Sequence, residues 1–315
     1  MSKKKKIQIS SNEAVKHVIQ SLIVNLLIVV AKGFAAFMTK SGAMLAETIH
    51  SFADCANQGL LLIGIKQSKR PADETHPFGY GMSVYFWSFM VAMLLFSIGG
   101  MFSIYEGIHK YSSPEPVEAI GWGIGILIFS IFLEGFAAYS NVVEINNRRK
   151  NNYSFFGYLK STKDSDLIVI FGENSAAVLG LILALIAMLT SYATGDGRYD
   201  AIGSLAIGVV LILVAIFLSI KVKSLLIGES ADPIILKTIE NLIANNPEIE
   251  TLINCKTIQQ GPGEVLVCMK IKFITNININ QISNIINQFE RDLRSKHEDV
   301  KWIYVEPDMQ EWKIN

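Results

Sequence analysis

The chain has 315 residues, of which half are hydrophobic and only 18% are charged, and its mean hydropathy is +0.36. This balance excludes an ordinary soluble protein and indicates several membrane spans with a modest water-soluble part. The formal net charge is zero, and we expect no nucleic-acid partner. The three cysteines form no CxxC pair and no recognisable disulfide framework, so we expect small buried side chains and no disulfide partner.

Six apolar segments of about 20 residues follow one another, and each is long enough to cross the hydrocarbon core of a bilayer. We predict them at residues 18–38, 42–65, 82–104, 120–142, 167–189 and 201–220. The first is too long for the apolar part of a signal peptide and has no evident cleavage site, so we expect it to be retained. The lipid bilayer is therefore the chain's first expected partner.

Lysine and arginine gather on one side of these segments. That side carries Lys3, Lys4, Lys5, Lys6, Lys16, Lys66, Lys69, Arg70, Arg148, Arg149, Lys150, Lys160, Lys163, Lys221 and Lys223. The other side carries only Lys40, Lys110 and Arg198. The positive-inside rule then places both termini in the cytoplasm. Because the Lys-rich start of the chain does not resemble a mitochondrial transit peptide, we expect a multi-pass protein of the bacterial inner (plasma) membrane.

The second segment carries a polar stripe. On a helix, an arc of about 120° contains Glu47, His50, Ser51, Asp54, Asn57 and Gln58. Each ionisable group at mid-membrane costs about 2.5–3.5 kcal/mol, so the stripe requires compensating partners or a function. His50 and Asp54 stand four residues apart, about 6 Å along one face, a spacing that lets both bind one metal ion.

The other segments differ in polarity. The first contains Asn25 and Lys32, the fourth Glu134, and the fifth Glu173 and Asn174. The third and sixth have no ionisable group through their centres, so we expect them to pack outside a polar interior formed by the other four. Lys32 is expected to pair with a carboxylate inside the bundle or to reach the membrane interface.

The second and fifth segments are the best candidates for a metal site. If they face each other, one nitrogen and three oxygens come from His50, Asp54, Glu173 and Asn174. This donor set suits a borderline divalent ion such as Zn²⁺ better than Cu⁺ or Ca²⁺. Glu47, one turn away, is a further candidate as an outer-sphere or proton-accepting group. Alternatively, these groups only form hydrogen bonds between helices.

The loop Arg70–Gly81 is rich in proline and glycine. Asp73 and His76 could share a metal ion there at the membrane surface, although such a segment is more often only a turn. After residue 224 the pattern becomes that of a soluble domain. It predicts a helix from residue 233 to about 246, strands at 251–259 and 265–273, a helix at 279–296 and a strand at 301–305.

This order predicts a small sheet with two helices on one face. The expected domains are a basic cytoplasmic N-terminus (1–15), a six-helix transmembrane domain (16–224) and a cytoplasmic C-terminal domain (225–315). A domain of about 85 residues just supports its own core, and association with a second copy would help it.

Two long motifs resemble the cation diffusion facilitator family. Ser41–Asp54 is similar to its second-helix signature, in which HxxxD or DxxxD forms half of the transport site, and Arg70–Gly81 is similar to its cytoplasmic turn. Six spans with a ferredoxin-like α+β tail match the family in number and order. Leu133–Gly135 and Glu173–Gly180 resemble the branch that contains the mitochondrial zinc exporter.

The resemblance implies a homodimeric antiporter, not an enzyme, that moves Zn²⁺ or a related cation out of the cytoplasm against protons. The family's HxxxD of the fifth helix falls at Ile170 and Asn174, which leaves Glu173 as the only acidic ligand there. Tyr80 replaces the second histidine of the loop, and Cys255 and Glu306 stand where relatives often carry metal-binding histidines.

Three alternatives stay open. The first is a transporter of the same architecture that prefers Fe²⁺, Mn²⁺ or Co²⁺. The second is an intramembrane metalloenzyme, which would need an HExxH-like motif or a third histidine, and neither is visible in the sequence. The third is a non-transporting interaction protein whose polar stripe is only structural.

Overall fold

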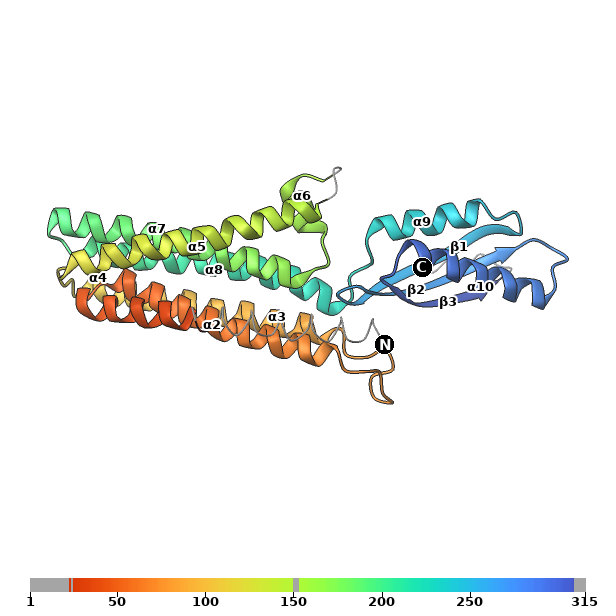
Figure 1. The fold of residues 1–315 in the computed structure, drawn as a ribbon, viewed down its shortest axis with the longest axis horizontal. Helices are drawn as coiled ribbons and strands as arrows, with labels where there is room; N and C mark the ends of the chain where they lie inside the picture. Colours follow the sequence, from red (N-terminus) through yellow and green to blue (C-terminus); the bar gives the residue numbers. More distant parts are fainter. Residues whose placement is uncertain (1–22, 24, 150–152, 309–315) are drawn as a thin grey trace, which may run out of the picture. The chain divides into compact units, whose positions relative to one another are not determined.

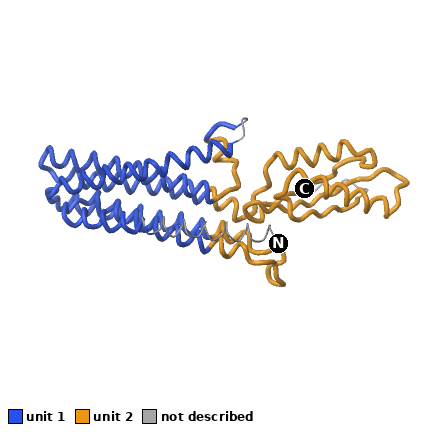
Figure 2. The backbone as a smooth tube through the Cα atoms, in the orientation of Figure 1, with its two compact units in different colours: residues 1–63, 87–155, 166–220 blue, residues 64–86, 156–165, 221–315 orange. Residues whose placement is uncertain are grey.

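The computed structural model describes residues 23, 25–149 and 153–308 (Figure 1). The predicted basic segment 1–15 and the beginning of the first span lie outside these residues. The chain divides into two compact units (Figure 2). The first comprises residues up to Ile63, Trp87–Phe155 and Asp166–Ile220, and the second comprises Gly64–Phe86, Phe156–Ser165 and the residues from Lys221 onward. The predicted domain boundary after residue 224 stays a prediction.

Long helices form most of the first unit, and several continue into the second (Figure 1). After a first helix described over Asn25–Thr39 come α2 (Gly42–Ser68), α3 (Ser83–Leu94), the π-helical turn η1 (Leu95–Met101), α4 (Phe102–Ser112), α5 (Ile120–Arg148), the short α6 (Phe155–Ser161), α7 (Ser165–Thr194) and α8 (Arg198–Ile227). By length and composition, four continuous helices in the described residues can cross a membrane: Ser83–Ser112, Ile120–Arg148, Ser165–Thr194 and Arg198–Ile227. α2 has 27 residues and carries the polar stripe.

The prediction that the third and sixth spans pack outside the others was wrong. Ile207, Leu211 and Leu218 of α8 are fully buried. Of the most apolar stretch of each helix, 44% is buried in α8 and only 17% in α5, which was predicted to face the interior. Gly100 and Gly208 let the third span approach α8 so closely that a Cβ at Gly208 would lie 2.9 Å from Gly100 O. Apolar side chains pack between helices as readily as polar ones. A helix without charged residues can therefore lie inside the bundle.

The start of α2 is fixed by α8. Asp200 Oδ2 accepts a hydrogen bond from Gly42 N at 2.5 Å, and its Oδ1 accepts one from Ser41 Oγ at 2.5 Å. The first N–H groups of a helix have no partner within the helix, so this carboxylate satisfies a donor that would otherwise be unpaired in the membrane. The bonds also hold the polar stripe of α2 at a defined height in the bundle.

The second unit contains the α+β domain that the sequence predicts. Its elements are α9 (Pro233–Ala244), β1 (Ile249–Gly261), β2 (Glu264–Phe273), α10 (Ile279–Lys296) and β3 (Val300–Pro307). The sheet order is β1-β2-β3, with β1 antiparallel and β3 parallel to β2. Ile239 of α9 and Leu293 of α10 are fully buried in one apolar core with Val267 of β2, so both helices cover the same face. The predicted fold class is confirmed.

Candidate functional site

The polar stripe of α2 faces the interior of the helix bundle, as predicted. Glu47, His50 and Asn57 are each 0% exposed, whereas Phe52 on the opposite face is 52% exposed. Polar groups in a membrane helix are stabilised only where they meet protein or a water-filled cavity. This orientation therefore gives the stripe access to partners from other helices.

His50 and Asp54 stand together on this stripe with unused bonding capacity. His50 Nδ1 lies 3.6 Å from Asp54 Oδ1, one helical turn away. Both ring nitrogens of His50 and the Oδ1 atom of Asp54 have no hydrogen-bond partner among the described residues. A buried polar atom without a partner costs about 1–3 kcal/mol. The pair is therefore poised to bind an ion or a proton that would satisfy it.

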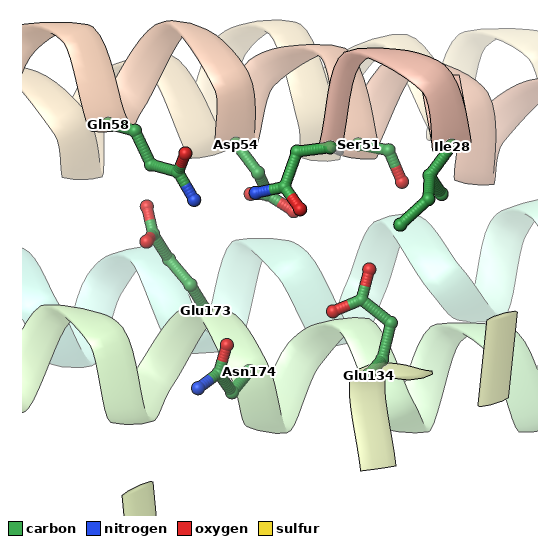
Figure 3. Close-up of a pocket in the computed structure, with 8 residues that line it drawn as sticks. Ile28, Ser51, Asp54, Gln58, Glu134, Glu173 and Asn174 are labelled. Atoms are coloured by element: carbon green, nitrogen blue, oxygen red, sulfur yellow. The ribbon is translucent and has the colours of Figure 1, made fainter. Parts of the chain in front are cut away.

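A small cavity lies beside Asp54 (Figure 3). Its volume is about 40 Å³, which is enough for a water molecule or an ion. It is lined by Asn25, Ile28, Ser51, Asp54, Gln58, Glu134, Glu173 and Asn174. These residues come from the first helix, α2, α5 and α7, the four segments predicted to surround a polar interior. That part of the prediction is confirmed.

Glu173 of α7 is tied to α2 by a hydrogen bond. Asn57 Nδ2 donates to Glu173 Oε1 at 2.7 Å, and Glu173 is 8% exposed. Figure 3 shows the Glu173 carboxylate directed toward Gln58 of α2. The sequence predicts that Asn57 and Gln58 belong to the polar stripe, but they were not assigned to the site. They follow Asp54 by three and four residues, and this spacing could have indicated that they lie beside it.

The structure does not bring all the predicted metal ligands to one point. Asp54, Glu173 and Asn174 line the cavity, whereas His50 does not. Among the described residues, no three His, Cys, Asp or Glu side chains stand close enough to hold one ion. Coordination of one ion by the four predicted donors stays a prediction.

Lys32 pairs with a carboxylate inside the bundle, as predicted. Its Nζ atom lies 3.4 Å from Glu47 Oε2 and donates a hydrogen bond to Ser51 Oγ at 2.7 Å. Both side chains of the ion pair are 0% exposed. Glu47 Oε1 has no hydrogen-bond partner in the described part of the chain. Glu47 was predicted as an outer-sphere or proton-accepting group, and its charge is already balanced by Lys32.

The loop pair of Asp73 and His76 belongs to a self-contained turn. The Tyr80 hydroxyl, the Thr75 hydroxyl and N–H, and the His76 N–H all donate hydrogen bonds to the Asp73 carboxylate. These bonds, that from Tyr80 above all, hold the pKa of Asp73 well below its ordinary value. His76 also stacks on Tyr80 with 4.1 Å between ring centroids. Both side chains are therefore already engaged, and metal binding there stays a prediction.

Comparison with known proteins gives consistent results. The sequence-family model of the cation efflux transmembrane domain matches residues 18–227 of the chain. The chain is 33% identical over 259 residues to the human mitochondrial proton-coupled zinc antiporter SLC30A9, covering 82% of this chain and 46% of the relative. It is 29% identical over 273 residues to metal tolerance protein C4 of Arabidopsis thaliana, covering 85% of this chain and 59% of that protein.

A shorter match of 35% identity over 102 residues is to the magnetosome protein MamB of Paramagnetospirillum magneticum, covering 31% of this chain and 34% of the relative. The chain therefore spans less than two thirds of the length of each of these curated relatives.

Proposed function

The chain belongs to the cation efflux family, and on this premise we propose that it exports divalent metal cations from the cytoplasm in exchange for protons, with Zn²⁺ as the principal cargo. The zinc assignment is supported by the human relative, which is named as a proton-coupled zinc antiporter. In this proposal the chain is a transporter and no residue has a catalytic role.

The transported ion binds His50, Asp54, Glu173 and Asn174. The observation that carries this assignment is the buried His50 ring with two unpartnered nitrogens, 3.6 Å from a carboxylate that lines a polar cavity. Glu173 and Asn174 line the same cavity from α7. A shift of α7 relative to α2 would bring the four donors around one ion, and such a rearrangement is what alternating access requires.

Proton exchange follows from the chemistry of these ligands. Metal binding requires a neutral imidazole and ionised carboxylates, so protons and metal compete for the same atoms. A higher proton concentration on the far side of the membrane therefore favours release of the ion there, so a proton gradient drives the exchange. Protons entering from the far side displace the metal, and loss of those protons to the cytoplasm restores the site.

A harder divalent ion, Fe²⁺, Mn²⁺ or Co²⁺, is the second candidate cargo. The cavity favours it in one respect, because its polar lining consists of carboxylates, amides and a hydroxyl without an imidazole. Oxygen donors suit Mn²⁺ and similar ions, whereas imidazole suits Zn²⁺. The two assignments differ in whether His50 turns toward the cavity when the ion binds.

The chain is a multi-pass membrane protein, and we place it in the plasma membrane with both termini in the cytoplasm. The names of the human and other vertebrate relatives include a mitochondrial location, which makes a mitochondrial membrane the alternative. A homodimer associated through the C-terminal domain, residues 225–315, completes the proposal.

The proposal is tested by zinc flux into liposomes that contain the purified full chain. We expect uptake of radioactive Zn²⁺ by the unmodified protein and loss of it in His50→Ala, which removes a ligand, and in Asp54→Asn, which replaces a charged ligand by a neutral one. Glu250→Gln, which changes an exposed carboxylate paired with Lys272, is the matched control and should transport normally. Zinc uptake that persists in Asp54→Asn and His50→Ala would rule out this site.

A further inference from the structure

Glu134 is a membrane-embedded carboxylate that the proposed four-ligand site does not use. It is the only Asp, Glu, Lys, Arg or His of α5 between Ile120 and Val143. It forms no hydrogen bond or ion pair with any other described residue. A carboxylate at such a position costs about 2.5–3.5 kcal/mol on insertion scales, so it requires a partner that the protein alone does not provide.

The inward face of α5 includes Glu134. The buried positions of this helix are Gly123, Leu127, Ser130, Asn141 and Ile145. Glu134 lies four residues after Ser130 and seven residues before Asn141, so it falls on the same face. The carboxylate is therefore directed into the bundle, while neighbours such as Phe132 and Phe136, 80% and 71% exposed, point outward.

Glu134 lines the same cavity as Asp54 and Glu173. Figure 3 shows Glu134 and Glu173 rising from α5 and α7 toward α2, with Asp54 and Ser51 on the opposite wall. Three carboxylates thus surround a space of about 40 Å³. Like charges in so small a volume repel one another unless a cation or protons neutralise them.

A second observation indicates that the cavity receives a ligand. His50 is fully buried with both ring nitrogens unpartnered among the described residues, and its Nδ1 atom is directed at Asp54 on the cavity wall. Gln58 Oε1 and Asp54 Oδ1 are buried acceptor atoms of residues on the same wall, and they also lack a hydrogen-bond partner among the described residues. A cation in the cavity satisfies the Gln58 and Asp54 oxygens directly, and His50 joins it through the shift that the four-donor site requires.

We propose that Glu134 is a further cation ligand, which extends the four-donor site so that it also accepts six-coordinate, oxygen-preferring divalent cations such as Mn²⁺. This inference rests on the proposed function and concerns the range of its cargo. Zn²⁺ is satisfied by four ligands in a tetrahedron, so His50, Asp54, Glu173 and Asn174 suffice for it. Mn²⁺ prefers octahedral oxygen coordination, and Glu134 with a cavity amide or hydroxyl supplies the remaining donors.

The experiment compares equilibrium binding of Mn²⁺ and Zn²⁺ to the full chain in lipid nanodiscs, before and after Glu134→Gln. Glutamine keeps the shape of the side chain and removes its charge. We expect Mn²⁺ affinity to fall about tenfold or more, the scale of losing a contact in a metal site, while Zn²⁺ affinity changes less than about threefold. Glu144→Gln on the same helix, where Glu144 is exposed and paired with Arg148, is the control and should change neither affinity.

Glu134→Asp provides a second variant, because it keeps the charge and withdraws it by one methylene. The Mn²⁺ affinity of this variant should lie between that of the unmodified chain and that of Glu134→Gln. Mn²⁺ affinity that is unchanged in both variants, or that falls no more than Zn²⁺ affinity, overturns the assignment of Glu134. Unmodified protein that binds Zn²⁺ but no Mn²⁺ also overturns it and leaves the proposed function intact. If the unmodified protein binds neither ion, both this inference and the proposed function are contradicted.

Discussion

The buried lysine of the first helix shows how a single residue makes the polar stripe tolerable. Lys32 Nζ lies 3.4 Å from Glu47 Oε2 and balances the charge of that carboxylate, and neither side chain is exposed to solvent. Removing one partner of a buried ion pair leaves an uncompensated charge, which is far more costly than removing both. The pair also fixes Ser51, which lines the cavity, through the hydrogen bond from Lys32.

Lys32→Met should therefore destabilise the protein by about 3–5 kcal/mol, because Glu47 loses its counter-charge. Adding Glu47→Gln should restore most of the loss, since the double variant buries no unpaired charge. Thermal unfolding of the detergent-solubilised protein measures both effects, with the exposed Lys69→Met as a control. If the double variant is no more stable than Lys32→Met alone, the ion pair does not have this role.

A second prediction at this scale concerns the hydrogen bond that orients Glu173. Asn57→Leu removes the donor to Glu173 Oε1, so the carboxylate loses its fixed direction and Zn²⁺ affinity should fall about tenfold. Asn141→Leu is the matched control, because it removes a buried amide whose oxygen has no described partner and which does not line the cavity. Equal Zn²⁺ affinities in the two variants, measured by isothermal titration calorimetry, would contradict this role of Asn57.

At the scale of helices, the sequence predicts more than the position of each segment. The apolar periodicity finds every long membrane helix that the structure describes, although the third to sixth segments end several residues earlier in the prediction than in the structure, and the short α6 was not predicted. Every element of the C-terminal domain lies within a few residues of its predicted bounds. The spacing of His50 and Asp54 also predicts their contact. The packing order of the helices is not predictable in the same way, because the burial of α8 depends on neighbours such as Gly100, which are distant in sequence. Glu134 was recognisable as costly, but only the fold brings it to the same cavity as Glu173.

The spacing of α2 and α7 depends on Gly180. A Cβ atom at this position would collide with Glu47 Oε1, so any other residue forces the Glu47 carboxylate or the helix to move. Gly180→Ala should cost about 1–3 kcal/mol of stability and weaken Zn²⁺ binding, because it displaces the Glu47 carboxylate from Lys32 or moves α7 with its Glu173 away from α2. Gly125→Ala on α5, where a Cβ meets no atom within 4 Å, should be neutral or slightly stabilising. Thermal unfolding and Zn²⁺ titration of both variants decide this, and equal behaviour of the two would contradict it.

For the whole molecule, the proposed exchange of metal and protons predicts a definite pH dependence. The ligands bind Zn²⁺ only after losing their protons, so lowering the pH must weaken binding. Each proton released per ion bound weakens the affinity about tenfold per pH unit once the pH is below the pKa of that ligand. In His50→Ala the residual Zn²⁺ binding should depend less steeply on pH, and an unchanged slope would show that His50 does not release a proton.

Membership of the cation efflux family is the largest inference that the sequence supports at this scale, and the match over residues 18–227 confirms it. Two stretches, Ser41–Asp54 and Arg70–Gly81, carry enough residues in a fixed order to identify the family. The identity of the cargo depends on the few donors around the cavity, where this chain departs from the family's usual fifth-helix pair at Ile170 and Asn174.

The central claim is that one mid-membrane site exchanges a divalent cation for protons, and countertransport in liposomes tests it most directly. Liposomes that contain the full chain receive Zn²⁺ outside and an acidic interior, while a zinc dye and a pH dye report both fluxes. We predict that zinc enters as protons leave, that collapse of the gradient slows zinc entry, and that Asp54→Asn abolishes both fluxes. Zinc entry at the same rate without the gradient, or in Asp54→Asn, would contradict the account.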